Sequence, residues 1–300
     1  MSDKLSIGGQ AVIEGVMMRS PHAFTVAVRR GGKPGAEIAV LKEEIRPVGD
    51  RLPLFKKKVL RGSIALFEAL WLGIRALNFS ANEALEDEEG KKEQIGPFAM
   101  AGTMLLALGF AFGLFFGLPL LLTHLLGAKY AALKGNVLFN LTDGAIRVTV
   151  FLGYVSSISF LKDIRRVFEY HGAEHKVIGA FEAGEALTVA NVRKHTCIHP
   201  RCGTSFLMVV IVLSILLFSM IPAAWPLWAK GAARICLLPL VAGLSYELIR
   251  FSAKKRGHPV VEALILPGLL LQRITTREPS DDQLEVAVRA MDEALALEPR

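Results

Sequence analysis

Two histidines and a glutamate near the middle of the chain have the types and spacing of a metal-binding helix. His171 and His175 stand one helical turn apart in the run HGAEH, and Glu174 lies between them. Side chains four positions apart share one face of a helix, so both imidazoles can reach one ion. The order H-x-x-E-H is that of the inverted zinc proteases. It predicts a two-histidine metal face with Glu174 as a catalytic base, although many helices contain this order by chance.

A second group of metal-ligating residue types follows in the same segment. The run HPRCG, from His199 to Gly203, has the ligand-x-x-ligand-glycine form of a zinc knuckle, whose glycine lets backbone N–H groups turn toward the thiolate. Two more candidates stand at alternate positions just before it. The full set of candidate ligands is His171, His175, His195, Cys197, His199 and Cys202. Imidazole and thiolate together suit Zn²⁺ and tolerate Fe²⁺ or Co²⁺.

A metal is one of two interpretations of these residues. A single histidine is more often an interfacial residue with satisfied hydrogen bonds, and a single cysteine a small buried apolar residue. Because both groups fall within one segment of about 40 residues, we favour a metal site. A catalytic zinc keeps an open position beside three protein ligands, whereas four ligands close a structural zinc. With Glu182 and Glu185 also nearby, the candidates are too many for the sequence to decide between these two.

The composition of the chain is that of a membrane protein. Apolar residues make up 52% of its 300 residues, and the mean hydropathy is +0.41. Both values are high for a soluble fold of this length. Four stretches reach the roughly 20 apolar residues that a helix needs to cross a bilayer. They are residues 97–125, 143–161, 205–227 and 234–251.

The basic residues predict how these stretches are oriented. Segments 1–96, 161–204 and 250–300 hold 15, 7 and 8 Lys and Arg, whereas segments 126–142 and 227–234 hold 2 each. Cytoplasmic loops carry the basic excess. We therefore expect a multi-pass protein of the bacterial cytoplasmic (inner) membrane, with both termini and the central segment in the cytoplasm, where thiols stay reduced. The expected partner is the lipid bilayer and not nucleic acid, because the basic residues form no single recognition stripe.

The remaining patterns divide the chain into six parts around the expected mainly α-helical fold. Alternation at Phe24–Arg30 and Glu37–Glu43 around a glycine-rich turn predicts a hairpin. The parts are a β-rich cytoplasmic unit (1–55), an amphipathic helix and charged linker (56–96), a first transmembrane pair (97–161), a cytoplasmic His/Cys loop (162–204), a second transmembrane pair (205–251), and a re-entrant or interfacial segment with a C-terminal amphipathic helix (252–300). Pro267 and Gly268 are expected to break the apolar run of the last part.

Several residues inside apolar stretches also carry expectations. Asp143 and Arg147 are four positions apart and should pair at the membrane interface, with Thr142 as a helix cap. Glu247 should pair with Arg250, and Glu14 either with Arg19 or with the metal site. A double G-x-x-x-G at Gly109, Gly113 and Gly117 should let another helix of the chain pack closely.

With these residues in hand, the chain resembles the YqhQ-like family of bacterial membrane proteins, a family of unknown function labelled as predicted metal-dependent enzymes. The resemblance covers nearly the whole length and rests on specific strings. They are IGGQAVIEGVMMR at 7–19, Arg61-Gly62, Ser80-Ala81, EYHGAEHK at 169–176, HPRCGTSF at 199–206, Pro267-Gly268 and TREP at 276–279. The resemblance implies a metal and an enzyme but no substrate.

The sequence thus favours a metal-dependent membrane hydrolase, in which zinc activates water and Glu174 moves the proton. The alternative is a membrane scaffold or assembly factor whose structural zinc joins the central segment to the N-terminal unit. A metal transporter ranks third, because the spans hold too few acids and histidines to form a path.

Overall fold

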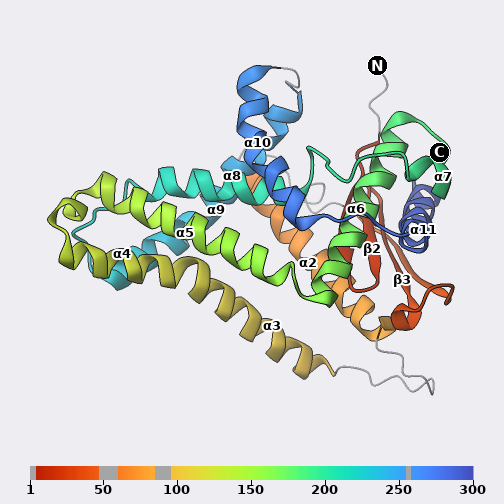
Figure 1. Cartoon of the computed structure of the whole chain (residues 1–300), viewed down its shortest axis with the longest axis horizontal. Coiled ribbons are helices and arrows are strands. Elements are labelled where there is room, and N and C mark those ends of the chain that lie inside the picture. The colour runs from red at the N-terminus through yellow and green to blue at the C-terminus, as the bar shows by residue number, and fades with distance from the viewer. Residues whose placement is uncertain (1–4, 47–59, 85–95, 255–257, 300) are drawn as a thin grey trace.

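The computed structural model describes residues 5–46, 60–84, 96–254 and 258–299. Within them the chain is mainly helical, with one small antiparallel sheet formed by the N-terminal residues. Figure 1 shows the sheet with α6, α7 and α11 at one end, and a bundle of long helices extending away from it. The helices are α2 Leu60–Ala84, α3 Pro97–Phe112, the π-helix η3 Gly113–Gly117, α4 Leu118–Lys129, η4 Ala131–Lys134, α5 Asn136–Ile158, α6 Lys162–Ala183, α7 Val189–Val192, α8 Gly203–Phe218, α9 Leu227–Lys254, α10 Pro259–Thr275 and α11 Asp281–Leu297.

The sheet contains four strands in the order of the sequence. They are β1 Gly8–Val12, β2 Gly15–Arg19, β3 Ala23–Arg29 and β4 Ile38–Glu44, and each pairs antiparallel with the next. The predicted hairpin is confirmed as β3 and β4, where Arg29 pairs with Ile38. Its turn includes Gly31 and Gly32 at positive φ, a conformation that glycine adopts without strain. Segment 47–55 of the predicted β-rich unit and the charged linker lie outside the described residues.

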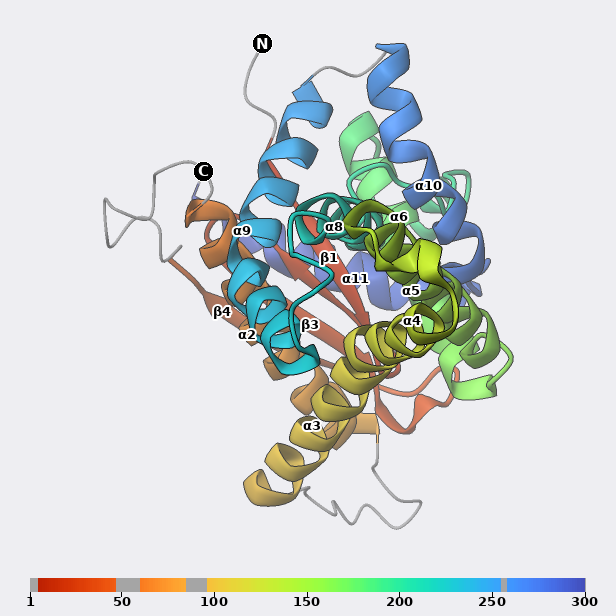
Figure 2. The ribbon, with the colours of Figure 1, turned by 90° about the vertical axis from the view of Figure 1, so that its left-hand side faces the viewer.

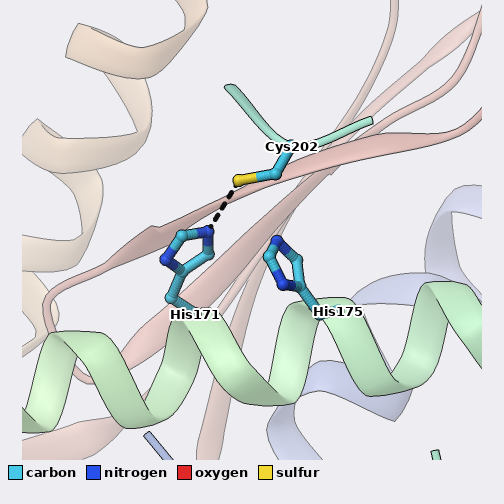
Figure 3. A group of neighbouring side chains, drawn as sticks. All are labelled: His171, His175 and Cys202. Carbon is cyan, nitrogen blue, oxygen red and sulfur yellow. Dashed lines mark hydrogen bonds between the residues drawn. The ribbon is translucent and has the colours of Figure 1, made fainter. Parts of the chain in front are cut away.

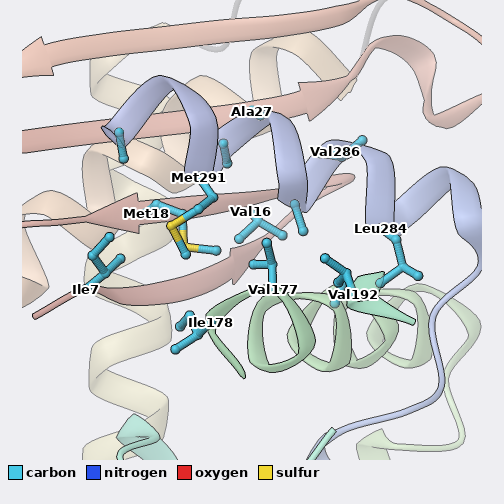
Figure 4. Packing of buried hydrophobic residues seen from close by; sticks show 14 of the residues in the cluster. Ile7, Val16, Met18, Ala27, Val177, Ile178, Val192, Leu284, Val286 and Met291 are labelled. Atoms are coloured by element: carbon cyan, nitrogen blue, oxygen red, sulfur yellow. The ribbon is translucent and has the colours of Figure 1, made fainter. Parts of the chain in front are cut away.

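Helices cover both faces of this sheet. On one face, Val16 and Met18 pack against Val177 of α6 and Met291 of α11 (Figure 4). On the other face, Phe24 packs in a second cluster with residues of α2. Because side chains alternate between the faces, a strand covered on both sides is buried along its whole length. This accounts for the fully buried run of β3.

Among the described residues, three helices are long and apolar enough to cross a membrane. They are α2, the stretch Ala101–Lys129 that runs from α3 through η3 into α4, and Leu227–Ser252 of α9. A fourth results if α5 and α6, which meet at an angle of 99°, are counted as one bent span. The apolar helix α8 is shorter and ends at Phe218, so the expected span 205–227 is not one continuous helix.

Two expectations about breaks and packing in the helices were wrong. Helix α10 continues through Pro267, and Gly268 lies where α10 crosses α8 so closely that a Cβ there would meet the Cα of Ser205 at 2.6 Å. The G-x-x-x-G glycines of α3 and η3 contact no other helix, since nothing among the described residues lies within 4 Å of a Cβ built at Gly109, Gly113 or Gly117.

Ion pairs between elements differ from those expected along the sequence. The Glu247 carboxylate of α9 accepts a hydrogen bond from Arg61 Nε of α2 at 2.6 Å, and not from Arg250. This contact joins α2 to α9, which lie side by side (Figure 2). Glu14, in the β1–β2 turn, pairs with Arg166 at the start of α6, whereas Arg19 pairs with Glu68 of α2. These pairs fix α2 and α6 on opposite faces of the sheet.

Candidate metal centre

Helix α6 brings the first two candidate ligands out of the bundle and onto the sheet. It begins after Leu161, just past the sharp bend that follows α5, and ends at Gly184 in the left-handed conformation (φ 75°). Its residues 170 and 172–178 are buried because α11 and β1 pack against them. His171 and His175 therefore lie on a helix that packs against the sheet, and Figure 1 shows this helix where the bundle meets the sheet.

Three of the six candidate ligands meet at this junction. The ligand atoms of His171, His175 and Cys202 all lie within 4.8 Å of one another (Figure 3). The Nε2 atom of His171 is 3.1 Å from the Cys202 sulfur, and the two imidazole centroids are 4.4 Å apart. His175 and Cys202 are buried, with 1% and 8% of their surface exposed.

Backbone carbonyls orient both imidazoles toward the same space. Nδ1 of His171 donates to the carbonyl of Thr275 at 2.8 Å, and Nδ1 of His175 donates to the carbonyl of Cys197. A carbonyl only accepts, so Nδ1 carries the proton and Nε2 presents its lone pair. Nε2 of His175 is buried and has no hydrogen-bond partner among the described residues. Metal-ligating histidines have this arrangement, with one nitrogen held by a backbone acceptor and the other free for the ion.

The third ligand stands at the start of α8. Cys202 is the N-cap of that helix, and its sulfur accepts from the backbone N–H of Thr204 at 3.4 Å. The Thr204 hydroxyl also lies 3.1 Å from the sulfur. These contacts match what the knuckle pattern predicts for the glycine after the second ligand.

Glu174 is buried beside the histidines, against the edge strand β1. It is 4% exposed, and a Cβ built at Gly9 would meet its Cγ at 2.7 Å, so only glycine leaves room for this side chain. Burial raises the pKa of the Glu174 carboxyl, while the charges of His171 and His199 and the backbone N–H of Ala11 act in the opposite direction. The carboxyl is thus close enough to the histidines for their charges to affect its protonation.

His199 lies near the three-residue cluster but is engaged elsewhere. Its ring centroid is 5.8 Å from that of His175. Nδ1 accepts from the backbone N–H of Arg201 at 3.4 Å, and Nε2 is 3.3 Å from the Glu182 carboxylate. The buried Gln272 side chain accepts from the His199 N–H at 2.8 Å and donates to its carbonyl at 2.9 Å. These contacts hold His199 in a second layer around the cluster.

The other two candidates have different roles in the structure. Nε2 of His195 is 3.3 Å from the Glu185 carboxylate. The Cys197 thiol lies 3.3 Å from Glu278, and burial, together with that carboxylate, raises its pKa to about 12. A thiol with so high a pKa is a poor ligand near neutral pH. Cys197 contributes its carbonyl, which orients His175.

Some residues that shape the site carry no signal in the sequence. Thr275 acts through its backbone carbonyl, and Gly172 allows a close approach, since a Cβ there would lie 2.0 Å from the Arg277 carbonyl. Gln272 is one amide in an apolar helix. The last turn of α10 and the segment after it give these contacts, so only the folded arrangement identifies them.

Comparison with known proteins places the chain in a family without assigning a reaction. Residues 58–297 match the model of the family described as Protein of unknown function (DUF1385). The chain is 34% identical over 302 residues to the "Uncharacterized protein YqhQ" of Bacillus subtilis (strain 168). This alignment covers 97% of the present chain and 92% of the Bacillus protein. No solved structure matches. Since the match includes α2 through α11, the chain belongs to the DUF1385 family.

Proposed function

We propose that this protein is a zinc-dependent hydrolase of the cytoplasmic membrane, with the ion held by His171, His175 and Cys202. One observation carries the proposal. The buried Nε2 atom of His175 has no partner among the described residues and faces the same space as His171 Nε2 and the Cys202 sulfur. A buried nitrogen without a partner is costly, and a shared ion satisfies all three atoms at once. Two imidazoles and one thiolate are a donor set that zinc enzymes use.

The number of ligands favours an enzyme over a structural site. Only three ligand atoms converge among the described residues, and His199 has its own contacts with Arg201 and Glu182. A zinc ion with three protein ligands has a fourth position for water or substrate. When bound there, the ion would supply Lewis acidity for polarising a carbonyl or phosphoryl oxygen and for activating water.

In this proposal Glu174 moves the proton. Its pKa is raised by burial, and a carboxyl with a raised pKa is better matched to proton transfer near neutral pH than an exposed one. The charges of His171 and His199 act on it, while Gly9 and the N–H of Ala11 hold it against the sheet. Its position beside the site is therefore well defined.

The alternative function is a membrane scaffold with a structural zinc. One observation favours it, namely that the His199 ring is only 5.8 Å from that of His175. A rotation of His199 away from Glu182 would provide a fourth ligand and close the site. The two functions differ in whether Glu174 is needed.

The first experiment measures metal in the purified full-length protein. We expect about one zinc ion per chain, and a large loss of it in His175→Ala and Cys202→Ala, because removal of one of three ligands opens the coordination shell. Cys236→Ala and His258→Ala are matched controls, since both side chains are exposed and outside the cluster. Full metal content in both ligand variants would exclude these residues as ligands.

The second experiment separates the enzyme from the scaffold. Glu174→Gln keeps the size of the side chain but removes the proton-transfer group, so an enzyme should lose about 10²- to 10⁴-fold in activity while it keeps its metal. Complementation of a deletion strain, with expression and zinc content measured alongside, gives the readout without knowledge of the substrate. Complementation at wild-type level would rule out Glu174 as the base and support the scaffold.

A further inference from the structure

A second group of buried ionisable residues lies far from the metal centre, inside the helical bundle. Asp143 and Arg147 come from α5, and Lys230 and Arg234 from α9. Each is at most 3% exposed. Asp143, Lys230 and Arg234 lie within the first eight residues of α5 or α9, and Arg147 lies one turn further along α5. Both helices begin at the end of the bundle remote from the sheet (Figure 1). We call these four residues the bundle charge cluster.

The single carboxylate of the cluster is fully used by the two arginines. One oxygen of Asp143 accepts from Arg147 Nη2 at 2.8 Å, and the other from Arg234 Nη1 at 2.9 Å. Arg147 Nη1 also donates to the Ser214 hydroxyl at 3.0 Å. The Nε atoms of both arginines are buried and have no hydrogen-bond partner among the described residues. The cluster thus contains two buried N–H donors that have no acceptor among the described residues.

Lys230 is a third cation without an acid of its own. In the described part of the chain its ammonium forms neither an ion pair nor a hydrogen bond, and it lies 4.1 Å from the centroid of the Phe139 ring. Aromatic rings also lie beside the arginines, with Phe218 at 5.1 Å from Arg147 and 5.2 Å from Arg234. Cation–π contacts reduce the cost of burying these cations but supply no net negative charge.

The formal charges of the cluster therefore do not balance. Three cations face one carboxylate, and buried charges in a membrane protein are normally paired or mark a binding site. Donors without acceptors together with excess positive charge call for an oxyanion, and guanidinium groups match a phosphate especially well. The surroundings fit the depth of lipid headgroups, because Trp225 and the 76% exposed Trp228 lie at the same end of α9, and tryptophans gather at that level of a bilayer.

We propose that the bundle charge cluster binds an anionic phosphate group, held by Lys230 and the free Nε–H groups of Arg147 and Arg234. The source is either the headgroup of an anionic phospholipid or a soluble phosphate. This site is independent of the metal centre and rests only on the membrane location. Neither the zinc nor Glu174 takes part in it.

The test uses thermal unfolding of the full-length protein purified in a neutral detergent. The probes are phosphatidylglycerol, phosphatidylcholine and sodium phosphate. Binding to the folded state raises the midpoint of unfolding, and the rise grows with the ratio of ligand concentration to Kd, so phosphatidylglycerol or phosphate should raise it by several degrees more than phosphatidylcholine does. A rise in the midpoint with phosphatidylglycerol but not with sodium phosphate would identify a lipid site. A rise with sodium phosphate would identify a soluble ligand.

Lys230→Met removes the cation that has no ion pair, so the fold should survive. We expect about tenfold weaker apparent affinity for the phosphate group, the effect of losing one charged contact. Arg250→Gln is the matched control, because it removes an exposed cation near the other end of the same helix. Its response should equal that of the unmodified protein. Asp143→Asn tests the charge argument, since it adds excess positive charge and should leave binding equal or tighter.

Two results would overturn the proposal. One is an unmodified protein that responds to phosphatidylglycerol and to phosphate no more than to phosphatidylcholine, and this result needs no variant to fold. The other is a Lys230→Met protein that keeps the full response while Arg250→Gln loses it, which would assign the effect to general surface charge.

Discussion

The protein alone holds the His175 ring in its orientation. The Cys197 carbonyl holds its Nδ1, and the rest of the ring is packed so that only 1% of the residue is exposed. The helical spacing predicted that His171 and His175 would share a face, and that much follows from one turn of helix. The spacing did not predict that Cys202 would join them while His199 stays outside the cluster. Gln272 and Glu182 hold His199 there, and no spacing rule identifies those contacts. Local geometry was predictable, and the selection among ligands was not.

Gly172 provides a residue-level test of how closely α6 must approach the segment after α10. A Cβ at this position would lie 2.0 Å from the Arg277 carbonyl, so Gly172→Ala must displace the backbone next to His171. We expect a loss of about 1–3 kcal/mol of stability together with lower zinc content. Gly153→Ala in α5 is the control, because nothing lies within 4 Å of its Cβ and alanine favours helix. Thermal unfolding measures the stability of the two variants, and metal analysis measures their zinc content. Equal stability and equal zinc content in the two variants would contradict the packing at Gly172.

Glu174 should reduce the stability of the metal-free protein as the pH rises. Its pKa is raised in the folded state by burial, so folding favours the protonated carboxyl. This contribution is complete below the ordinary pKa of a glutamate and is lost as the pH rises through the raised value. Glu174→Gln cannot ionise, so its stability relative to the chelator-treated unmodified protein should increase between pH 4 and pH 8. Unfolding midpoints across about this pH range measure the difference. A constant difference would show that Glu174 ionises freely in the folded protein.

At the scale of elements, the sequence predicted those that repeat a simple period. The alternation of β3 and β4 and the amphipathic pattern of α11 were both readable. The helix boundaries that tertiary contacts set could not be predicted. Helix α5 begins at Asn136, seven residues before the expected start of the span, so Thr142 is not a cap and the Asp143–Arg147 pair is buried. Helix α10 passes through Pro267 because its packing on α8 stabilises it from outside.

Helix α11 supports the candidate metal centre by packing against α6. It packs on both the sheet and α6, and Met291 lies fully buried between them (Figure 4). Met291→Ala should cost about 2–5 kcal/mol, because the cavity cannot fill. Since α6 depends on this packing, zinc affinity should fall with stability. Met220→Ala is the matched control, being 78% exposed, and should change stability by less than about 0.5 kcal/mol. A stable, zinc-replete Met291→Ala protein would show that α6 holds its position unaided.

For the whole molecule, packing restricts which helices can cross a bilayer. Ile7, Val177 and Met291 share one hydrophobic core, so the N-terminal strands, α6 and α11 would lie on the same side of a bilayer that the apolar helices cross. An even number of crossings must then separate β4 from α6, and α6 from α11. The α3–α4 stretch with α5, and α9 with the shorter apolar helix α8, would satisfy this condition. Helix α2 is apolar enough to span, but its packing on the sheet favours an interfacial position.

Counting basic residues predicts that this shared side is the cytoplasmic one, although one count rested on a wrong boundary. Lys230 and Arg234 were assigned to an outer loop, whereas α9 begins at Leu227 and buries both. Their removal from the loop leaves the outer side still poorer in basic residues, which strengthens the predicted orientation. The same error concealed the bundle charge cluster, since residues assigned to a loop do not suggest a buried site.

The predicted topology can be tested with reporter fusions at three positions. A reporter at the C-terminus, and one inserted between residues 85 and 95, should both report the cytoplasm, whereas one inserted after Lys134 should report the outside. The physical reason is twofold, because the shared core of the strands, α6 and α11 forbids an odd number of crossings and the basic excess lies on the sheet side. Each fusion must also retain zinc, so that only folded protein is scored.

A cytoplasmic signal after Lys134 would exclude the α3–α4 stretch as a span. An outside signal between residues 85 and 95 would instead make α2 a span, and by parity would require either α5 or the α3–α4 stretch to remain within one leaflet.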